Sequence, residues 1–208
     1  MTTGVLDERS MELIESICRS LYDNSLDHGW PHIERVLGYA FNIVEGEELD
    51  ISRDKIKLAV YLHDLGRVIG EPHAFYSSLI ARELLGELGL PGTLIEEIVG
   101  AIEEHSYSYK RSTEPSTLLS VVLSDADKLD ALGVVGFLRV FIYGCRNSRS
   151  LEDSLRHFHE KIFKLKNHVK LEYSRRLAEQ LDERTRLLLG MLQDELGYLG
   201  IQIASPSS

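Results

Sequence analysis

The sequence contains little cysteine and no excess of basic residues. Its 208 residues include only two cysteines, Cys18 and Cys145. Two cysteines cannot form a disulfide framework in a chain of this length, so we expect a protein of the reducing cytoplasm. Lys and Arg number 23 against 33 Asp and Glu, which makes the formal net charge −10. This charge argues against binding to a nucleic-acid polymer, but a few cations in one pocket can still bind a small phosphorylated substrate.

Segments that would cross or enter a membrane are also missing. The stretch with the fewest charges, 131–144, is interrupted by Arg139 and falls short of the roughly 20 apolar residues that a span needs. Residues 1–10 lack the basic start and apolar run of a secretory signal. We therefore expect no association with a membrane.

Apolar residues recur at helical spacing along almost the whole chain, and no alternating run predicts a strand. Gly and Pro residues mark most of the joints, and a polar loop is predicted at 110–116. The predicted helices span 10–22, 31–46, 51–65, 73–88, 91–105, 118–131, 134–143, 151–165 and 168–199. With no repeat and no linker, the sequence predicts one all-α, single-domain bundle over 1–208, with a core at about 10–200 and a frayed tail at 204–208.

A His-Asp pair, His63 and Asp64, stands at the end of a predicted apolar helix face. A carboxylate near an apolar face is costly unless it is paired, hydrogen-bonded or bound to a metal ion. Taken alone, the pair also suits a structural contact at a helix end.

A second motif surrounds the start of the next predicted helix upstream, from Asp27-His28 through His32 to Arg35. A helix N-terminus with an arginine beside it is suited to hold a phosphate. The alternative is that Asp27 caps the helix and Arg35 makes a surface ion pair.

A third motif contains three acids, Asp125, Asp127 and Asp130. A calcium loop of the EF-hand type is excluded, because Asp130 stands where glycine is needed and Gly136 where glutamate is needed. The flanking segments are strongly apolar, so at least one of the acids must approach the interior.

Together the motifs offer two imidazoles and two carboxylates from three helices: His32, His63, Asp64 and Asp127. Mixed nitrogen and oxygen ligands suit Mn, Fe, Co, Ni or Zn better than Ca. The remaining histidines of the C-terminal part lie on a charged amphipathic segment and are not expected to be ligands.

This order of residues resembles the HD superfamily of metal-dependent phosphohydrolases, whose signature is a His, a His-Asp pair and a distant Asp on a helical bundle. Further similarity to the small, stand-alone bacterial and archaeal branch lies in Asp27-His28, Arg35-Val36, 125–133 and 158–165. The resemblance covers nearly the whole chain and implies an all-α HD-type bundle.

The resemblance implies roles for individual residues. It makes His32, His63, Asp64 and Asp127 the metal ligands, with Mn, Ni, Co, Fe or Zn as the ion and Mg still open. His73 and His105 resemble histidines that hold a second ion in binuclear relatives, or they face substrate phosphate. Arg67 stands where one family of HD nucleotidases carries a catalytic Glu, so it is expected to contact phosphate instead.

The implied activity is hydrolysis of a phosphate ester or anhydride by a metal-activated water. Asp64 would orient the water, and Asp130 or His105 would assist. The groups expected to bind phosphate oxygens are His28, Arg35, Arg67 and Lys128.

The branch implies a nucleotide substrate, through dNTP or NTP pyrophosphohydrolase or nucleotidase activity. A cyclic-dinucleotide phosphodiesterase with a binuclear site is the second enzyme hypothesis, although the chain lacks the Gly-Tyr-Pro signature of that branch. The rival from another class is a non-catalytic HD module that binds a nucleotide or a partner protein. The amphipathic last helix either packs within the chain or forms a homodimer.

Overall fold

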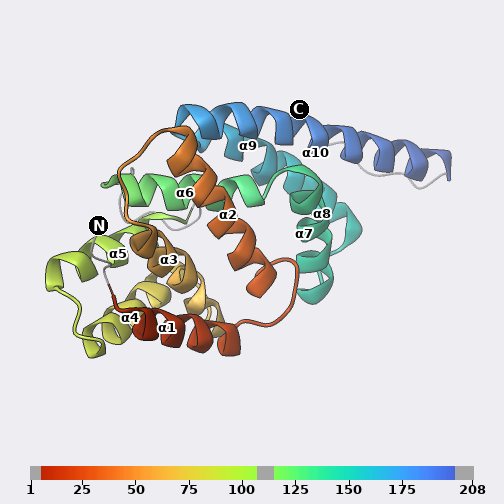
Figure 1. Ribbon diagram of the computed structural model, residues 1–208. Helices are drawn as coiled ribbons and strands as arrows, with labels where there is room; N and C mark the ends of the chain where they lie inside the picture. The colour runs from red at the N-terminus through yellow and green to blue at the C-terminus, as the bar shows by residue number, and fades with distance from the viewer. Residues whose placement is uncertain (1–5, 107–114, 200–208) are drawn as a thin grey trace. The chain divides into compact units, whose positions relative to one another are not determined.

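The computed structural model describes residues 6–106 and 115–199 (Figure 1). No strand occurs in these ranges, so the prediction of an all-α protein is confirmed. The α-helices are α1 (Glu8–Leu21), α2 (Trp30–Gly46), α3 (Arg53–Leu62), α4 (His73–Glu87), α5 (Gly92–Glu104), α6 (Leu118–Asp130), α7 (Gly133–Arg146), α8 (Leu151–His157), α9 (Phe163–Leu165) and α10 (Glu172–Tyr198). Short 3-10 turns lie at η1 (Leu65–Val68) and η3 (Lys166–His168), and a π turn lies at η2 (Phe158–Ile162). The predicted tail at 204–208 and most of the predicted loop at 110–116 lie outside the described residues.

The chain forms two compact units, Met1–Asp127 and Lys128–Ser208. Each unit is described by itself, and the single-domain organisation stays a prediction. Among the described residues, no helix is both long enough and apolar enough to cross a bilayer.

In the first unit, α3 contacts α1, α2, α4 and α5, so it is the central helix (Figure 1). Its apolar stripe is fully buried at Leu58, Ala59 and Leu62. Neighbouring helices contribute side chains such as Ile33 and Ile98, which are also fully buried. Burial of this apolar surface fixes the C-terminal end of α3, which carries the His-Asp pair.

The loop before α2 is held tightly by its own backbone. The Trp30 amide donates to the Asp23 carbonyl at 2.7 Å. A Cβ at Gly29 would lie 2.3 Å from that carbonyl oxygen, so this position requires glycine. Arg35 donates from Nη2 to the Leu26 carbonyl at 2.7 Å, which ties the first turns of α2 to the loop. The alternative in which Asp27 caps α2 is wrong, because Gly29 is the N-cap and no side chain caps the helix.

Most predicted helix boundaries differ from the structure by a few residues, the predicted helix 151–165 is divided into α8, η2 and α9, and two of the boundary differences have a cause that the structure shows. Helix α3 ends at Leu62 rather than at 65, because the His63 side chain hydrogen-bonds the Val60 carbonyl and the chain turns there. Helix α10 begins at Glu172 rather than near 168, because Val169 and Leu171 have extended backbone angles. Val169 is buried but lies before the helix, so apolar periodicity alone wrongly assigned it to the helix.

In the second unit, α7 packs against α10 and α8 (Figure 1). The Gly133 amide donates to Thr185 Oγ1 at 2.8 Å, which joins the start of α7 to α10. The rings of Phe137 and the buried Phe158 lie with their centroids 5.4 Å apart and their planes tilted by 32°. These contacts show the last helix packed against α7 of the same chain, as in the first of the two alternatives that the sequence leaves open.

Candidate metal centre

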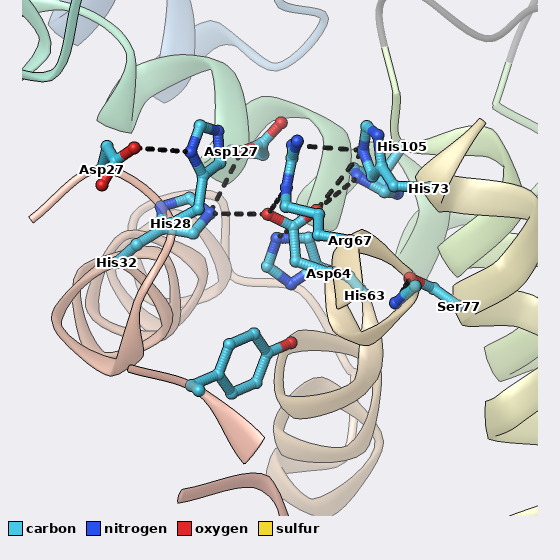
Figure 2. Close-up of polar contacts among 12 residues, drawn as sticks. Asp27, His28, His32, His63, Asp64, Arg67, His73, Ser77, His105 and Asp127 are labelled. Atoms are coloured by element: carbon cyan, nitrogen blue, oxygen red, sulfur yellow. Dashed lines mark hydrogen bonds and ion pairs between the residues drawn. The ribbon is translucent and has the colours of Figure 1, made fainter. Parts of the chain in front are cut away.

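The first unit brings together the four side chains that the sequence predicts as metal ligands (Figure 2). His32 Nε2 lies 3.6 Å from Asp64 Oδ2 and 3.6 Å from Asp127 Oδ1. His63 Nε2 lies 3.8 Å from Asp64 Oδ1. One ligand atom from each of His32, His63 and Asp127 falls within 4.8 Å of the other two, the spacing of a metal site.

Two further histidines approach the same carboxylate from another side. His73 Nε2 lies 3.3 Å and His105 Nε2 lies 3.8 Å from Asp64 Oδ1. His63, Asp64 and His105 form a second group with ligand atoms within 4.8 Å of one another. Figure 2 shows Asp64 between His32 on one side and the His73–His105 pair on the other.

The same local motif positions two of these histidines. His63 is the C-cap of α3, and His105 is the C-cap of α5. In both residues Nδ1 donates to the carbonyl three residues earlier, Val60 at 2.7 Å and Ile102 at 2.5 Å. Each bond satisfies a carbonyl in the last turn of the helix and turns Nε2 toward the centre of the site.

These hydrogen bonds decide where the ring hydrogens lie. A carbonyl oxygen can only accept, so Nδ1 carries the hydrogen in both rings. Burial, followed by the charge of His63, lowers the pKa of His105 to about 3. His105 is therefore neutral near pH 7, and its Nε2 presents a lone pair to the interior.

The buried acceptors fit a divalent cation. Among the described residues, His63 Nε2 and Asp64 Oδ1 are buried and make no hydrogen bond. Acceptors that face one another in a dry interior are unfavourable unless a cation lies between them. Imidazole nitrogens and carboxylate oxygens are ligands that Zn, Mn, Fe, Co and Ni accept, so the donor set fits the ion that the sequence predicts.

Both carboxylates of the centre are ionised. Burial raises the pKa of Asp64, but the positive charge of Arg67 and the nearby histidines outweigh burial and hold this pKa well below its ordinary value. The pKa of Asp127 is also lowered, because His105, His32 and His63 outweigh the effect of its burial. The two negative carboxylates give the centre the charge that a divalent cation balances.

The sequence from the start of α2 to just after α6 matches a known protein family. The family model described as HD domain covers residues 29–132, which is half of the chain. The chain belongs to the HD domain family. All four predicted ligands of this HD domain lie inside the matched residues.

Proteins similar to this chain include YpgQ of Bacillus subtilis (strain 168). The two sequences are 28% identical over 166 residues, and the match covers 77% of this chain and 80% of YpgQ. The crystal structure of YpgQ in complex with ADP has a TM-score of 0.72 and 25% identity, covering 89% of this chain and 97% of YpgQ. An HD-superfamily hydrolase from Bacillus thuringiensis has a TM-score of 0.65 and 26% identity, covering 91% of this chain and 96% of that chain.

The rim of the HD-domain site contains two of the predicted phosphate contacts. Arg67 donates from Nε to Asp64 Oδ2 at 2.5 Å, and 28% of its side chain is exposed. His28 lies at the other end, where its Nδ1 is 3.3 Å from Oδ2 of the buried Asp27 and 23% of its side chain is exposed. Its ring is 5.9 Å from the His32 ring between centroids. Both side chains reach from the metal centre to the surface.

The other predicted contacts lie in different surroundings. Arg35 donates to the Leu26 carbonyl, so part of its guanidinium supports the loop before α2. Lys128 directly follows Asp127 on α6 and is 6% exposed. Asp130 is buried and bonded to Arg139 of α7 at 2.5 Å. This bond pairs Asp130 with Arg139, whereas His105 Nε2 lies 3.8 Å from Asp64 Oδ1.

Sequence reasoning missed three residues that support the site. Ser77 Oγ accepts the Gly66 amide at 2.8 Å and holds η1 against α4. Tyr22 donates to the Tyr61 carbonyl at 3.1 Å, just before the His-Asp pair. Glu71 contacts both His73 and Arg67. Only the short distance from Glu71 to His73 along the chain is visible in the sequence.

Proposed function

We propose that this HD-domain protein is a metal-dependent phosphohydrolase that acts on a small phosphorylated substrate, and that the substrate is a nucleotide. The observation that carries the proposal is the convergence of buried imidazole nitrogens on the ionised Asp64, with acceptors facing one another. Relatives called HD-superfamily hydrolases support the reaction class.

His32, His63, Asp64 and Asp127 would hold the ion. When bound, a divalent transition ion would supply a Lewis acid that makes hydroxide available near neutral pH. Nδ1 of His63 is held by the Val60 carbonyl, so the Nε2 lone pair keeps a fixed direction. Asp64 accepts from Arg67 through Oδ2, which leaves Oδ1 to face the interior and orient a water molecule.

The exposed edge of the site supports an approach of substrate from one side. His32, His63 and Asp64 are at most 1% exposed, whereas the Asp127 side chain is 27% exposed. Arg67 and His28 are the partly exposed nitrogen donors near that edge. They would bind the oxygens of a phosphoryl group and stabilise the charge that develops on it.

The nucleotide part of the proposal is supported by YpgQ, whose structure is a complex with ADP. A nucleotide carries the phosphate oxygens that the rim cations would bind. Its charge is compatible with a net charge of −10 on the whole chain, because local cations dominate the field inside a small site.

The test measures release of phosphate and pyrophosphate from dNTPs, NTPs, NMPs and cyclic dinucleotides. Protein stripped with a chelator is assayed with Mn, Ni, Co, Mg or Fe(II) added back. Asp127→Asn is compared with Asp194→Asn, which changes an exposed aspartate on α10. His63→Gln is compared with His159→Gln, which changes an exposed histidine of the C-terminal part.

We expect metal-dependent turnover that falls at least about 100-fold in Asp127→Asn and His63→Gln and persists in both controls. Helix content by circular dichroism checks that each variant is folded. Cleavage of the cyclic substrates instead of the nucleotides would overturn the substrate assignment. Bound metal and bound nucleotide without turnover of any substrate would overturn the hydrolase and leave a binding module.

A further inference from the structure

His73 differs from His63 and His105 in how its outer nitrogen is held. His63 and His105 bond to main-chain carbonyls of their own helices. His73 opens α4, so no preceding turn of its helix is available to accept from its ring. Its Nδ1 lies instead 3.0 Å from Oε2 and 3.2 Å from Oε1 of Glu71.

Glu71 makes a compact set of contacts around this histidine. Its Oε2 also accepts the His73 backbone amide at 3.1 Å. Its Oε1 lies 3.7 Å from Arg67 Nη1. Glu71 lies just before the N-cap Pro72 of α4, and a carboxylate at a helix N-terminus interacts favourably with the helix dipole. Although 68% of its side chain is exposed, Glu71 is held in one place by two neighbouring residues.

The ring hydrogen of His73 is determined from both sides. Glu71 is a carboxylate, which accepts, so Nδ1 donates to it. Arg67 Nη2 lies 3.3 Å from His73 Nε2, and a guanidinium can only donate, so Nε2 accepts. The contacts with Glu71 and Arg67 favour a hydrogen on Nδ1, which leaves the Nε2 lone pair on the side of Arg67 and of Asp64, whose Oδ1 is 3.3 Å away.

We propose that Glu71 is the positioning residue of His73: its carboxylate selects the Nδ1–H tautomer and aims the bare Nε2 at the Asp64 side of the metal centre. The same carboxylate also lies beside the guanidinium of Arg67 and helps to hold it against Asp64 Oδ2. Glu71 acts through these neighbours and is not a catalytic residue. The effect on turnover rests on the proposed phosphohydrolase function, whereas the tautomer does not.

The experiment reads the tautomer directly in the full-length protein. Long-range proton–nitrogen NMR of the metal-free protein shows which ring nitrogen of His73 is protonated, and His73→Gln identifies its signals. The measurement is made at mildly alkaline pH. The variants are Glu71→Ala, which removes the acceptor, and Glu71→Gln, which keeps an acceptor oxygen. Glu87→Ala, an exposed glutamate at the end of the same helix, is the matched control.

We expect Nδ1–H in the unmodified protein and in Glu87→Ala, a shift toward Nε2–H in Glu71→Ala, and retention of Nδ1–H in Glu71→Gln. With Mn²⁺ and the substrate found active, kcat/KM should fall about 10- to 100-fold in Glu71→Ala and less in Glu71→Gln. A loss of stability alone would not change the tautomer of the folded population.

Two results would overturn the proposal. One is an unmodified protein in which His73 Nε2 carries the hydrogen, and the other is a Glu71→Ala variant whose tautomer is unchanged. If no variant turns over any substrate but the tautomer moves as expected, the positioning role stands and the proposed hydrolase activity fails. The experiment therefore tests the positioning role of Glu71 and the proposed hydrolase activity separately.

Discussion

Gly66→Ala tests whether the close contact between η1 and α4 holds the metal centre together. A Cβ at Gly66 would lie 2.2 Å from the His73 carbonyl oxygen and 2.5 Å from the Ser77 amide nitrogen. Both neighbours are backbone atoms, so they cannot move aside as the end of a flexible side chain does. Because ordinary contact begins at 3.4 Å, the two segments would have to separate by about 1.2 Å.

The cost of this separation has two parts. Overpacking a tight interior with one methyl group costs about 1–3 kcal/mol. The Gly66 amide also loses its 2.8 Å bond to Ser77 Oγ in a buried setting, which costs about 1–3 kcal/mol. We therefore expect Gly66→Ala to lower the free energy of unfolding by about 2–6 kcal/mol. The movement would also draw His73 away from Asp64 and weaken binding of Mn²⁺.

Urea unfolding followed by circular dichroism measures the stability, and isothermal titration calorimetry measures Mn²⁺ affinity. Gly38→Ala is the control, because Gly38 is an exposed residue of α2 with no described atom within 4 Å of a Cβ placed there. That control should gain about 0.5–1 kcal/mol from higher helix propensity. A Gly66→Ala variant within about 0.5 kcal/mol of the unmodified protein and with unchanged Mn²⁺ affinity would refute the steric argument.

Three further predictions concern single residues outside this contact. Tyr22→Phe removes the bond to the Tyr61 carbonyl and should cost about 1 kcal/mol in urea unfolding; an unchanged midpoint would contradict it. Burial and two nearby cations lower the pKa of His157 to about 4, so stability is lost as pH falls from about 6.5 toward 4. His157→Gln should remove about 1–2 kcal/mol of that loss, allowing for screening of a partly exposed ring, and parallel stability–pH curves would count against it. Arg139→Met leaves Asp130 as a buried charge and should cost about 3–5 kcal/mol, much of which Asp130→Asn in the same chain should restore; equal stability of the single and double variants would argue against the ion pair.

The helices were predictable because their signal is local. Apolar residues three and four positions apart give a buried stripe, and the stripe predicts a helix whatever its partners are. The same rule placed His63 on the α3 stripe but extended that helix too far. The helix ends early because the His63 ring bonds the Val60 carbonyl, a contact of one side chain that periodicity does not report.

The candidate site was predictable as a set of residue types in order. His32, the His63-Asp64 pair and Asp127 were proposed as ligands from their order and from a family resemblance, and that assignment remains a prediction. Their mutual distances depend on how α2, α3 and α6 pack in the first unit, which no local pattern encodes. Arg67, expected to bind phosphate, donates from Nε to Asp64 three residues earlier, a local contact that the sequence reasoning did not include.

By itself, the sequence determined an all-α chain of acidic charge, the approximate positions of its helices and its membership of the HD domain family. Only the tertiary structure decided that the Nε2 atoms of His63, His73 and His105 meet at Asp64, because α3, α4 and α5 must pack together before these rings converge. The acceptors on the outer side of the rings are local, such as the Val60 carbonyl for His63 and the Glu71 carboxylate for His73. Helical periodicity arises from neighbours along the chain, whereas the convergence of ligands from separate helices arises from groups that folding brings together.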